Sequence, residues 1–152
     1  HIIMLSFFAV ILLVVVAFCF GVGSYTFFTA CGRGKEVNWS DEAAVRATPF
    51  GKYYANIAQG RLWLQEHNAL DVYMNNRDGM RLHAVWVPKE NAKGTIIFAH
   101  GFRSCGLSDF SLAFDLYHKQ DMNILLLTHR THCPSQGKYI TFGVTESRDM
   151  YD

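Results

Sequence analysis

A long apolar stretch at the N-terminus most constrains what this chain can fold into. Between residues 2 and 20 the only polar side chain is Ser6, and no charged residue or histidine occurs from residue 2 to residue 32. A helix that crosses a bilayer needs about 20 such residues, whereas a long helix of a soluble protein carries a polar face. We therefore predict a transmembrane helix over residues 1–28, with residues 2–20 in contact with the membrane.

Three interpretations of this stretch remain open. It can be a retained signal anchor, or a signal peptide that is removed, although a removed peptide usually has an apolar region of only about 7–15 residues. It can also be a lipoprotein signal, because the small residue Ala30 precedes Cys31 in the sequence FTAC. The length of the apolar stretch favours the signal anchor, and we adopt that interpretation.

The remainder of the chain has a balanced charge. All 14 Lys and Arg residues and all 13 Asp and Glu residues lie beyond the apolar stretch. A net charge of +1 gives no electrostatic support for binding nucleic acid, so we expect no nucleic-acid partner. None of the four cysteines forms a C-x-x-C pair, and a disulfide between Cys105 and Cys133 is left open.

Composition changes along the chain suggest its segments. Residues 29–40 are polar and contain glycine, as a linker would, and Ser40 followed by two acidic residues predicts a helix start. After Pro49, apolar residues recur at steps of four and three up to about residue 65, which predicts an amphipathic helix. We therefore expect a transmembrane helix at 1–28, a linker and amphipathic helix at 29–66, and an α/β domain at 67–152.

The last segment contains four predicted strands. Residues 69–74 and 81–87 flank the turn sequence NNRDG and predict a hairpin. Residues 95–100 and 123–128 are continuous apolar runs, which are typical of strands buried on both faces. A helix capped by Ser108 or Asp109 is expected between these two runs, so they should pair in parallel.

Two loops after the apolar runs carry a specific resemblance. The first run, TIIFAHGF, ends in a His-Gly pair, and the second is followed by HRTHCPSQG. From about Leu70 to Asp152 the chain resembles the N-terminal half of an α/β-hydrolase, in particular the membrane-anchored bacterial serine hydrolases related to serine aminopeptidases and acylamino-peptidases. The resemblance implies an α/β fold, with a hairpin plus parallel strands and crossover helices forming half of the hydrolase sheet after the transmembrane helix.

The resemblance also assigns roles within the first loop. In this fold the loop after the third strand gives one backbone N–H to the oxyanion hole, which stabilises charge in the transition state. By position this donor is Phe102, which follows His100 and Gly101. Gly101 would allow a tight turn, and His100 would hold the loop together as a structural residue.

The second loop matches the family pattern D-x-R-x-H-G-x-S-x-G in part. Thr128 stands where the family has Asp, and Cys133 where it has Gly. The first change removes a charged partner, and the second adds a side chain where a positive φ is expected. The matching residues, which would brace the site, are Arg130, His132, Ser135 and Gly137.

No serine in the chain has the context of a nucleophile. The fold places its nucleophile in G-x-S-x-G, and the sequences around Ser104, Ser108 and Ser135 each lack at least one glycine. We therefore expect the catalytic triad to follow Asp152, so that this chain alone is inactive. The full-length protein would cleave an ester or amide bond of a small-molecule or peptide substrate through an acyl-enzyme. The alternative is a catalytically dead, membrane-tethered binding protein.

A metal site is the rival interpretation of the second loop. His129, His132 and Cys133 are possible zinc ligands, but zinc takes four ligands or three plus water, and no second cluster supplies the rest. We expect no metal and no organic cofactor.

The side of the membrane rests on two opposed signals. Arg33 and Lys35 follow the apolar stretch and by themselves favour a cytoplasmic domain. Because the chain begins with a histidine, we expect further residues before it, and basic ones would reverse this signal. Exported members of the family favour the outside, so we expect a membrane-anchored, extracytoplasmic domain.

Overall fold

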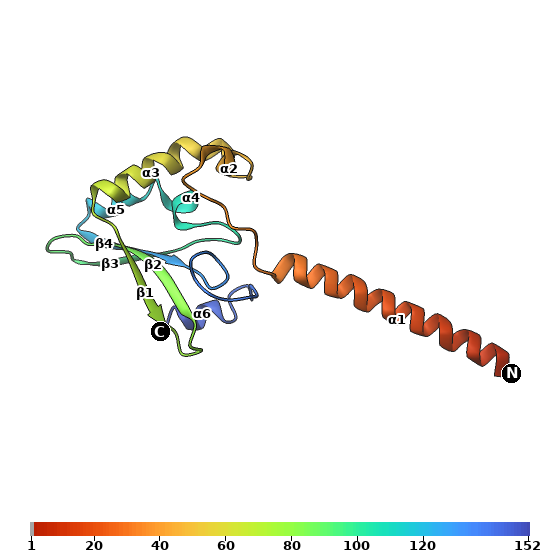
Figure 1. Ribbon diagram of the computed structural model, residues 1–152. Helices are drawn as coiled ribbons and strands as arrows, with labels where there is room; N and C mark the ends of the chain where they lie inside the picture. Colours follow the sequence, from red (N-terminus) through yellow and green to blue (C-terminus); the bar gives the residue numbers. More distant parts are fainter. Residues whose placement is uncertain (1) are drawn as a thin grey trace. The chain divides into compact units, whose positions relative to one another are not determined.

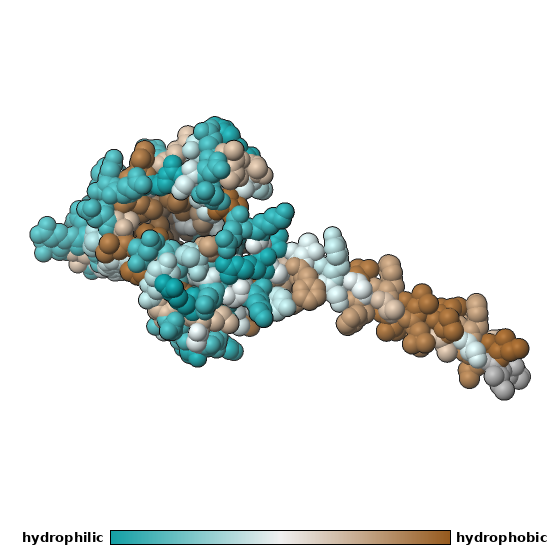
Figure 2. Space-filling model, in the orientation of Figure 1, coloured by the Kyte–Doolittle hydropathy of each residue, from teal (hydrophilic) through white to brown (hydrophobic). Residues whose placement is uncertain are grey.

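The computed structural model describes residues 2–152 and divides into two compact units, which meet in the chain at Gly32 and Arg33. The first unit is one helix, α1 (Ile2–Cys31), which runs three residues beyond the predicted end at residue 28. Its segment Ile3–Cys31 has none of its surface buried and is long and apolar enough to cross a membrane or to act as a signal sequence. Figure 2 shows apolar residues along most of this helix.

The second unit opens with short helical segments. Helix α2 (Glu42–Arg46) begins one residue later than a cap at Ser40 would give, because the Asp41 carboxylate accepts a backbone N–H at 2.9 Å. A turn containing the predicted proline break separates α2 from the 3₁₀ segment η1 (Gly51–Tyr53) and from α3 (Tyr54–Glu66). The amphipathic face of α3 buries Ile57, Gly60 and Leu64.

Four strands form one mixed sheet, in the spatial order β1-β2-β4-β3. The hairpin consists of β1 (Leu70–Asn75) and β2 (Arg81–Val87), which pair antiparallel. The two apolar runs are β3 (Gly94–Ala99) and β4 (Met122–Thr128), and they pair in parallel. The predictions of a hairpin and of a parallel pair are confirmed.

The segment between β3 and β4 contains two short helices. Helix α4 (Gly106–Phe110) begins earlier than the predicted cap at Ser108 or Asp109, and Cys105 occupies the cap position. The Ser108 hydroxyl accepts the Cys105 N–H at 3.1 Å and donates to the Cys105 carbonyl at 2.9 Å, so this serine closes the first turn from within. Helix α5 (Phe114–His118) completes the crossover.

One face of the sheet carries the hydrophobic core. Helices α3, α4 and α5 lie on this face, as Figure 1 shows, and the strand residues that point toward them alternate along each strand. Burial of these side chains is the main favourable contribution to folding. The fully or nearly buried members of the cluster are Leu64, Val87, Phe98, Phe114, Ile124 and Leu126.

The opposite face of the sheet remains largely uncovered. Val72, Met74 and Ile97 belong to it and are 36%, 41% and 50% exposed. The short helix α6 (Glu146–Asp149) lies on this side (Figure 1). Since parallel strands are normally covered on both faces, this apolar surface has the character of an interior face.

A pair of identical substitutions tests this division of the sheet. Ile124 is 0% exposed in β4, whereas Ile97 is 50% exposed in β3. We expect Ile124→Ala to lower the free energy of unfolding by about 2–5 kcal/mol, because it removes buried methylenes and leaves a cavity. Ile97→Ala should cost less than about 1 kcal/mol. Urea denaturation of the full chain in detergent, followed by tryptophan fluorescence, measures both; equal losses would contradict the assignment of the core face.

Candidate active site

The loops that follow β3 and β4 line one pocket. It has a volume of about 560 Å³ and lies within the second unit. Residues 103–105 of the first loop and residues 128 and 131–133 of the second loop form part of its wall. The rest of the wall comes from residues 33–39 and 47–50, which precede the sheet in sequence. Parallel pairing explains the shared position of the loops, because the carboxyl ends of both strands lie at the same edge of the sheet.

His100 is a structural residue of the first loop. It is only 4% exposed, and its Nε2 accepts the backbone N–H of His129 at 3.2 Å. The proton must therefore sit on Nδ1, which donates to the Gly101 carbonyl at 2.9 Å. Burial lowers the pKa of His100 to about 4, so the ring is neutral near pH 7 and ties the two loops together.

Asp109 holds the turn of the first loop. Its carboxylate accepts the Gly101 N–H at 2.8 Å and the Ser104 hydroxyl at 2.6 Å. The sequence indicated only a capping role for this aspartate. The Gly101 N–H is thereby committed, whereas the Phe102 N–H donates to no residue among those at 2–152. The loop thus leaves one free backbone donor, at the position that the resemblance assigns to the oxyanion hole.

The Phe102 side chain points away from the pocket wall. It is 51% exposed and stacks on Phe142, with ring centroids 5.4 Å apart and planes 18° apart. Phe102 itself does not line the pocket, although the next three residues do. The pocket and the predicted oxyanion donor are therefore neighbours in one loop and not a single cavity.

Ser135 and Gly137 fix the shape of the second loop. The Ser135 hydroxyl is 1% exposed, donates to the Thr128 carbonyl at 2.6 Å and accepts the His83 N–H at 2.9 Å. Gly137 has φ +126°, and a Cβ there would lie 2.8 Å from the backbone nitrogen of Thr131. Only glycine fits this position.

The positive φ expected at Cys133 is found elsewhere. It occurs at Thr131, with φ 71°, and not at Cys133. The expectation was wrong because the loop makes its left-handed turn two residues earlier, where the Thr131 N–H binds the Gln136 carbonyl at 2.9 Å. A side chain at Cys133 therefore adds no backbone strain of this kind.

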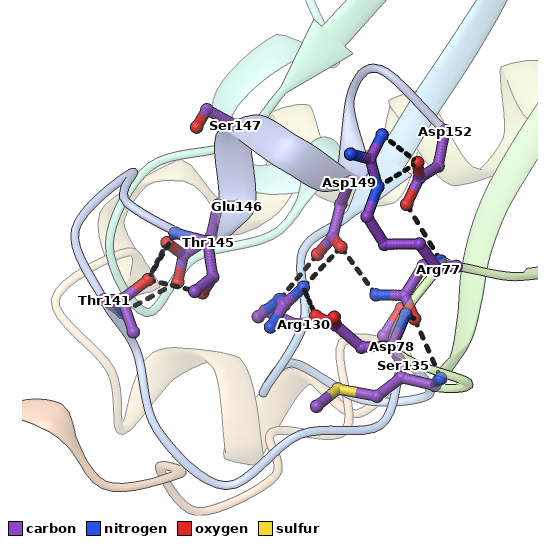
Figure 3. A network of polar contacts seen from close by, with 12 residues as sticks. Arg77, Asp78, Arg130, Ser135, Thr141, Thr145, Glu146, Ser147, Asp149 and Asp152 are labelled. Carbon is purple, nitrogen blue, oxygen red and sulfur yellow. Dashed lines mark hydrogen bonds and ion pairs between the residues drawn. The ribbon is translucent and has the colours of Figure 1, made fainter.

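Arg130 has charged partners despite the missing family aspartate (Figure 3). It is 5% exposed, and its Nε and Nη2 lie 2.7 and 2.6 Å from the carboxylate oxygens of Asp149. Nη2 also donates to Asp78 at 3.0 Å. Hydrogen bonding to Asp149 raises the pKa of Arg130 further, against the opposing effect of burial. The position of the missing aspartate, Thr128, is neutral, and its hydroxyl contacts the His83 ring at 2.8 Å.

The Arg130 pair connects three distant segments. Asp149 belongs to α6 and also accepts the Asn76 side-chain amide at 2.7 Å, from the turn of the hairpin. Arg77 of the same turn contacts Asp152 through its backbone N–H at 3.0 Å and its Nε at 2.7 Å. These contacts fasten the loop after β4 to the hairpin and to α6, as expected of a bracing residue.

Glu146 organises the end of the second loop. Its carboxylate is largely buried and accepts the N–H groups of Thr141 at 2.8 Å and Gly143 at 2.9 Å, together with the Thr141 hydroxyl (Figure 3). Burial works to raise the pKa of Glu146, but these hydrogen bonds outweigh it and the net shift is downward. The sequence indicated Glu146 only as a helix start, and its contacts could not be seen from spacing.

His132 has an unusual environment. Its Nδ1 lies 3.2 Å from the Arg130 carbonyl, and its ring centroid lies 4.6 Å from that of His100. Its Nε2 is the one buried side-chain nitrogen or oxygen in residues 2–152 that has no hydrogen-bond partner. Burial lowers the pKa of His132, so its neutral form is favoured.

Neither a metal cluster nor a disulfide unites the His and Cys residues of these loops. Over the described part of the chain, no three His, Cys, Asp or Glu side chains gather in a way that could hold a metal ion. Cys105 and Cys133 both line the pocket and are both free thiols, so the disulfide left open by the sequence is not formed.

Arg33 joins the N-terminal segment to the second loop. Its backbone N–H donates to the Lys138 carbonyl at 2.9 Å, and its guanidinium donates to the carbonyls of Ser135 at 2.9 Å and Gly137 at 3.4 Å. The sequence indicated residues 29–40 only as a linker. Residues 33–39 also form a wall of the pocket, and no local pattern signalled this.

The buried His100 predicts a pH dependence of stability. The unfolded chain binds a proton at this residue near pH 6.5, but the folded chain only near pH 4. Stability should therefore be fully present above pH 6.5 and fall as the pH drops toward 4, with a His100 contribution of about 3 kcal/mol. His100→Gln should be less stable at pH 7 but should show a shallower decline. Urea denaturation from pH 7 to pH 4.5 compares the two; parallel curves would contradict a neutral, buried His100.

Comparisons with known proteins agree with this architecture. No protein-family profile and no curated protein sequence matches the chain. Among solved structures it is similar to the Pyrococcus furiosus esterase Pf2001 in two crystal forms, with 25% identity in each. In one form the match covers 57% of this chain and 34% of the esterase chain with a TM-score of 0.50; in the other it covers 58% and 36% with a TM-score of 0.52. The chain thus spans about a third of the length of these esterase chains, and it has a partial α/β-hydrolase fold.

Proposed function

We propose that this chain forms the N-terminal part of a membrane-anchored serine hydrolase that cleaves an ester or amide through an acyl-enzyme. The observation that carries the proposal is the free Phe102 N–H, which follows a His-Gly pair at the carboxyl end of a parallel strand. A backbone donor fixed in this way stabilises an oxyanion without reorganisation during the reaction. The similarity to an esterase supports the same reaction class.

The hydrogen bonds of the serines support a nucleophile outside residues 2–152. Ser104 donates to Asp109, Ser108 exchanges hydrogen bonds with Cys105, and Ser135 donates to the carbonyl of Thr128. Each of these hydroxyls is committed to the shape of its loop, and none contacts a histidine side chain that could act as its base. The serines with the most suitable sequence context therefore act structurally.

The open surfaces of the sheet support the same conclusion. Strand β3 pairs with β4 and with no other strand among residues 2–152, and it carries neither a charge nor a proline on its free edge. Natural sheets protect such an edge. The apolar face that carries Val72 and Ile97 is also uncovered, so further polypeptide is needed at both places.

A catalytically dead, membrane-tethered binding protein remains the second candidate. The pocket favours it, because residues 33–133 supply the whole of its lining without a catalytic group. Both candidates share the anchor and exclude nucleic acid as a partner, and they differ in whether a nucleophile joins the free Phe102 N–H. The reading frame beyond Asp152 distinguishes them: the hydrolase requires G-x-S-x-G within about 40 residues.

The oxyanion role of Phe102 can be tested in the full-length protein. Phe102→Pro removes the backbone N–H, and we expect kcat for an ester substrate to fall about 10²–10³-fold. Phe102→Ala keeps the N–H and serves as the matched control, with kcat within a few-fold of the parent. Circular dichroism must show that both variants are folded. Equal activity of the two variants would remove Phe102 from the mechanism.

The anchor and its orientation can be tested together in cells. We expect the full chain to stay in the membrane pellet after alkaline carbonate extraction, with residues 2–31 retained in its mass. Cys133 is exposed, so in a variant without the other three cysteines an impermeant maleimide should label intact cells if the domain is extracytoplasmic. A further Cys133→Ser change is the control. Release by carbonate would exclude the anchor, and labelling only after lysis would reverse the orientation.

A further inference from the structure

The pocket begins almost where the apolar helix ends. Helix α1 ends at Cys31, and Arg33 already hydrogen bonds to the loop after β4. Only Gly32 separates them in the chain, and two residues of extended backbone reach at most about 7 Å. There is no slack linker, so a bilayer that contained α1 would keep residues 33–39 close to its surface.

One part of the pocket wall is apolar and aromatic. Trp39 and Phe50 form an edge-to-face pair with ring centroids 5.8 Å apart, and both line the cavity. Val37 and Pro49 lie in the same lining. A cavity of about 560 Å³ is within the range that accepts a small organic ligand, and an acyl chain suits aromatic and aliphatic walls.

Another part of the wall is basic. The lining contains the cations Arg33, Lys35 and Arg103 and one anion, Glu36, which pairs with Arg33 at 3.4 Å. Lys35 makes no ion pair with a residue in the described part of the chain. The excess of positive charge beside an apolar wall complements an amphiphile with an anionic head group.

We infer that this pocket binds a single-chain anionic amphiphile taken from the bilayer surface, with the acyl chain against Trp39 and Phe50 and the head group at Lys35. The inference rests on the proposed function for the anchor, and it specifies a lipid as the substrate class of the proposed hydrolase. A free inorganic anion shares the basic wall but not the apolar one. Simple attraction of Lys35 to an anionic membrane needs neither the cavity nor Trp39.

Trp39 provides a native reporter of occupancy. The full chain is placed in nanodiscs of neutral phosphatidylcholine and titrated with a dibrominated fatty acid, whose bromines quench tryptophan on contact. We expect saturable quenching that disappears in Trp39→Phe, where Trp63 and Trp86 still report the fold. Millimolar inorganic phosphate should not displace the fatty acid, whereas an unbrominated fatty acid should.

A charge reversal tests the head-group side. Lys35→Glu should raise the half-saturating concentration about tenfold, because it replaces an attraction by a repulsion at the head group. Lys93→Glu makes the same charge change before the start of β3, at the opposite end of that strand from the pocket, and should leave the titration unchanged.

Three results would overturn the inference. They are unsaturable quenching that persists in Trp39→Phe, equal affinities of the two charge-reversed variants, and displacement by phosphate alone. Binding requires no nucleophile, so these results would leave the Phe102 test untouched. Conversely, loss of the oxyanion role would not alter the quenching titration.

Discussion

Parallel pairing of β3 with β4 is the constraint on which the rest of the second unit depends. The register places Ile96 beside Ile124 and Phe98 beside Leu126, so that one face of both strands enters the core. Burial on that face fixes the register, since a slip of one residue would turn the apolar set outward. The same register sends both following loops from one edge of the sheet and makes a common pocket unavoidable.

The loops keep their shape because nearly all of their polar groups are satisfied within the protein. Asp109 takes the Gly101 N–H, and Ser135 links the loop after β4 to the strand below it. An unpaired buried polar group is costly, so hydrogen bonds of this kind hold a loop as firmly as apolar packing holds a strand. Against this background the free N–H of Phe102 and the unpartnered Nε2 of His132 are exceptions.

Much of the fold was predictable because its signals are local. Apolar runs marked β3 and β4, the sequence NNRDG marked the hairpin turn, and uninterrupted hydrophobicity marked α1. Boundaries were less predictable: α4 begins two residues before Ser108 because that side chain bonds back to Cys105. A cap chosen from residue type alone does not include such a competing contact.

The sequence by itself determined the class of each segment, since hydrophobic period and turn residues act over a few neighbouring positions. It also determined which residues could not be nucleophiles, because that motif is local. Only the tertiary structure decided that Asp149 neutralises Arg130 and that Arg33 brings an N-terminal wall to the loop ending at Gly137. These partners are 19 and 104 residues apart in the chain, and their contact depends on packing of the whole unit rather than on any periodic pattern.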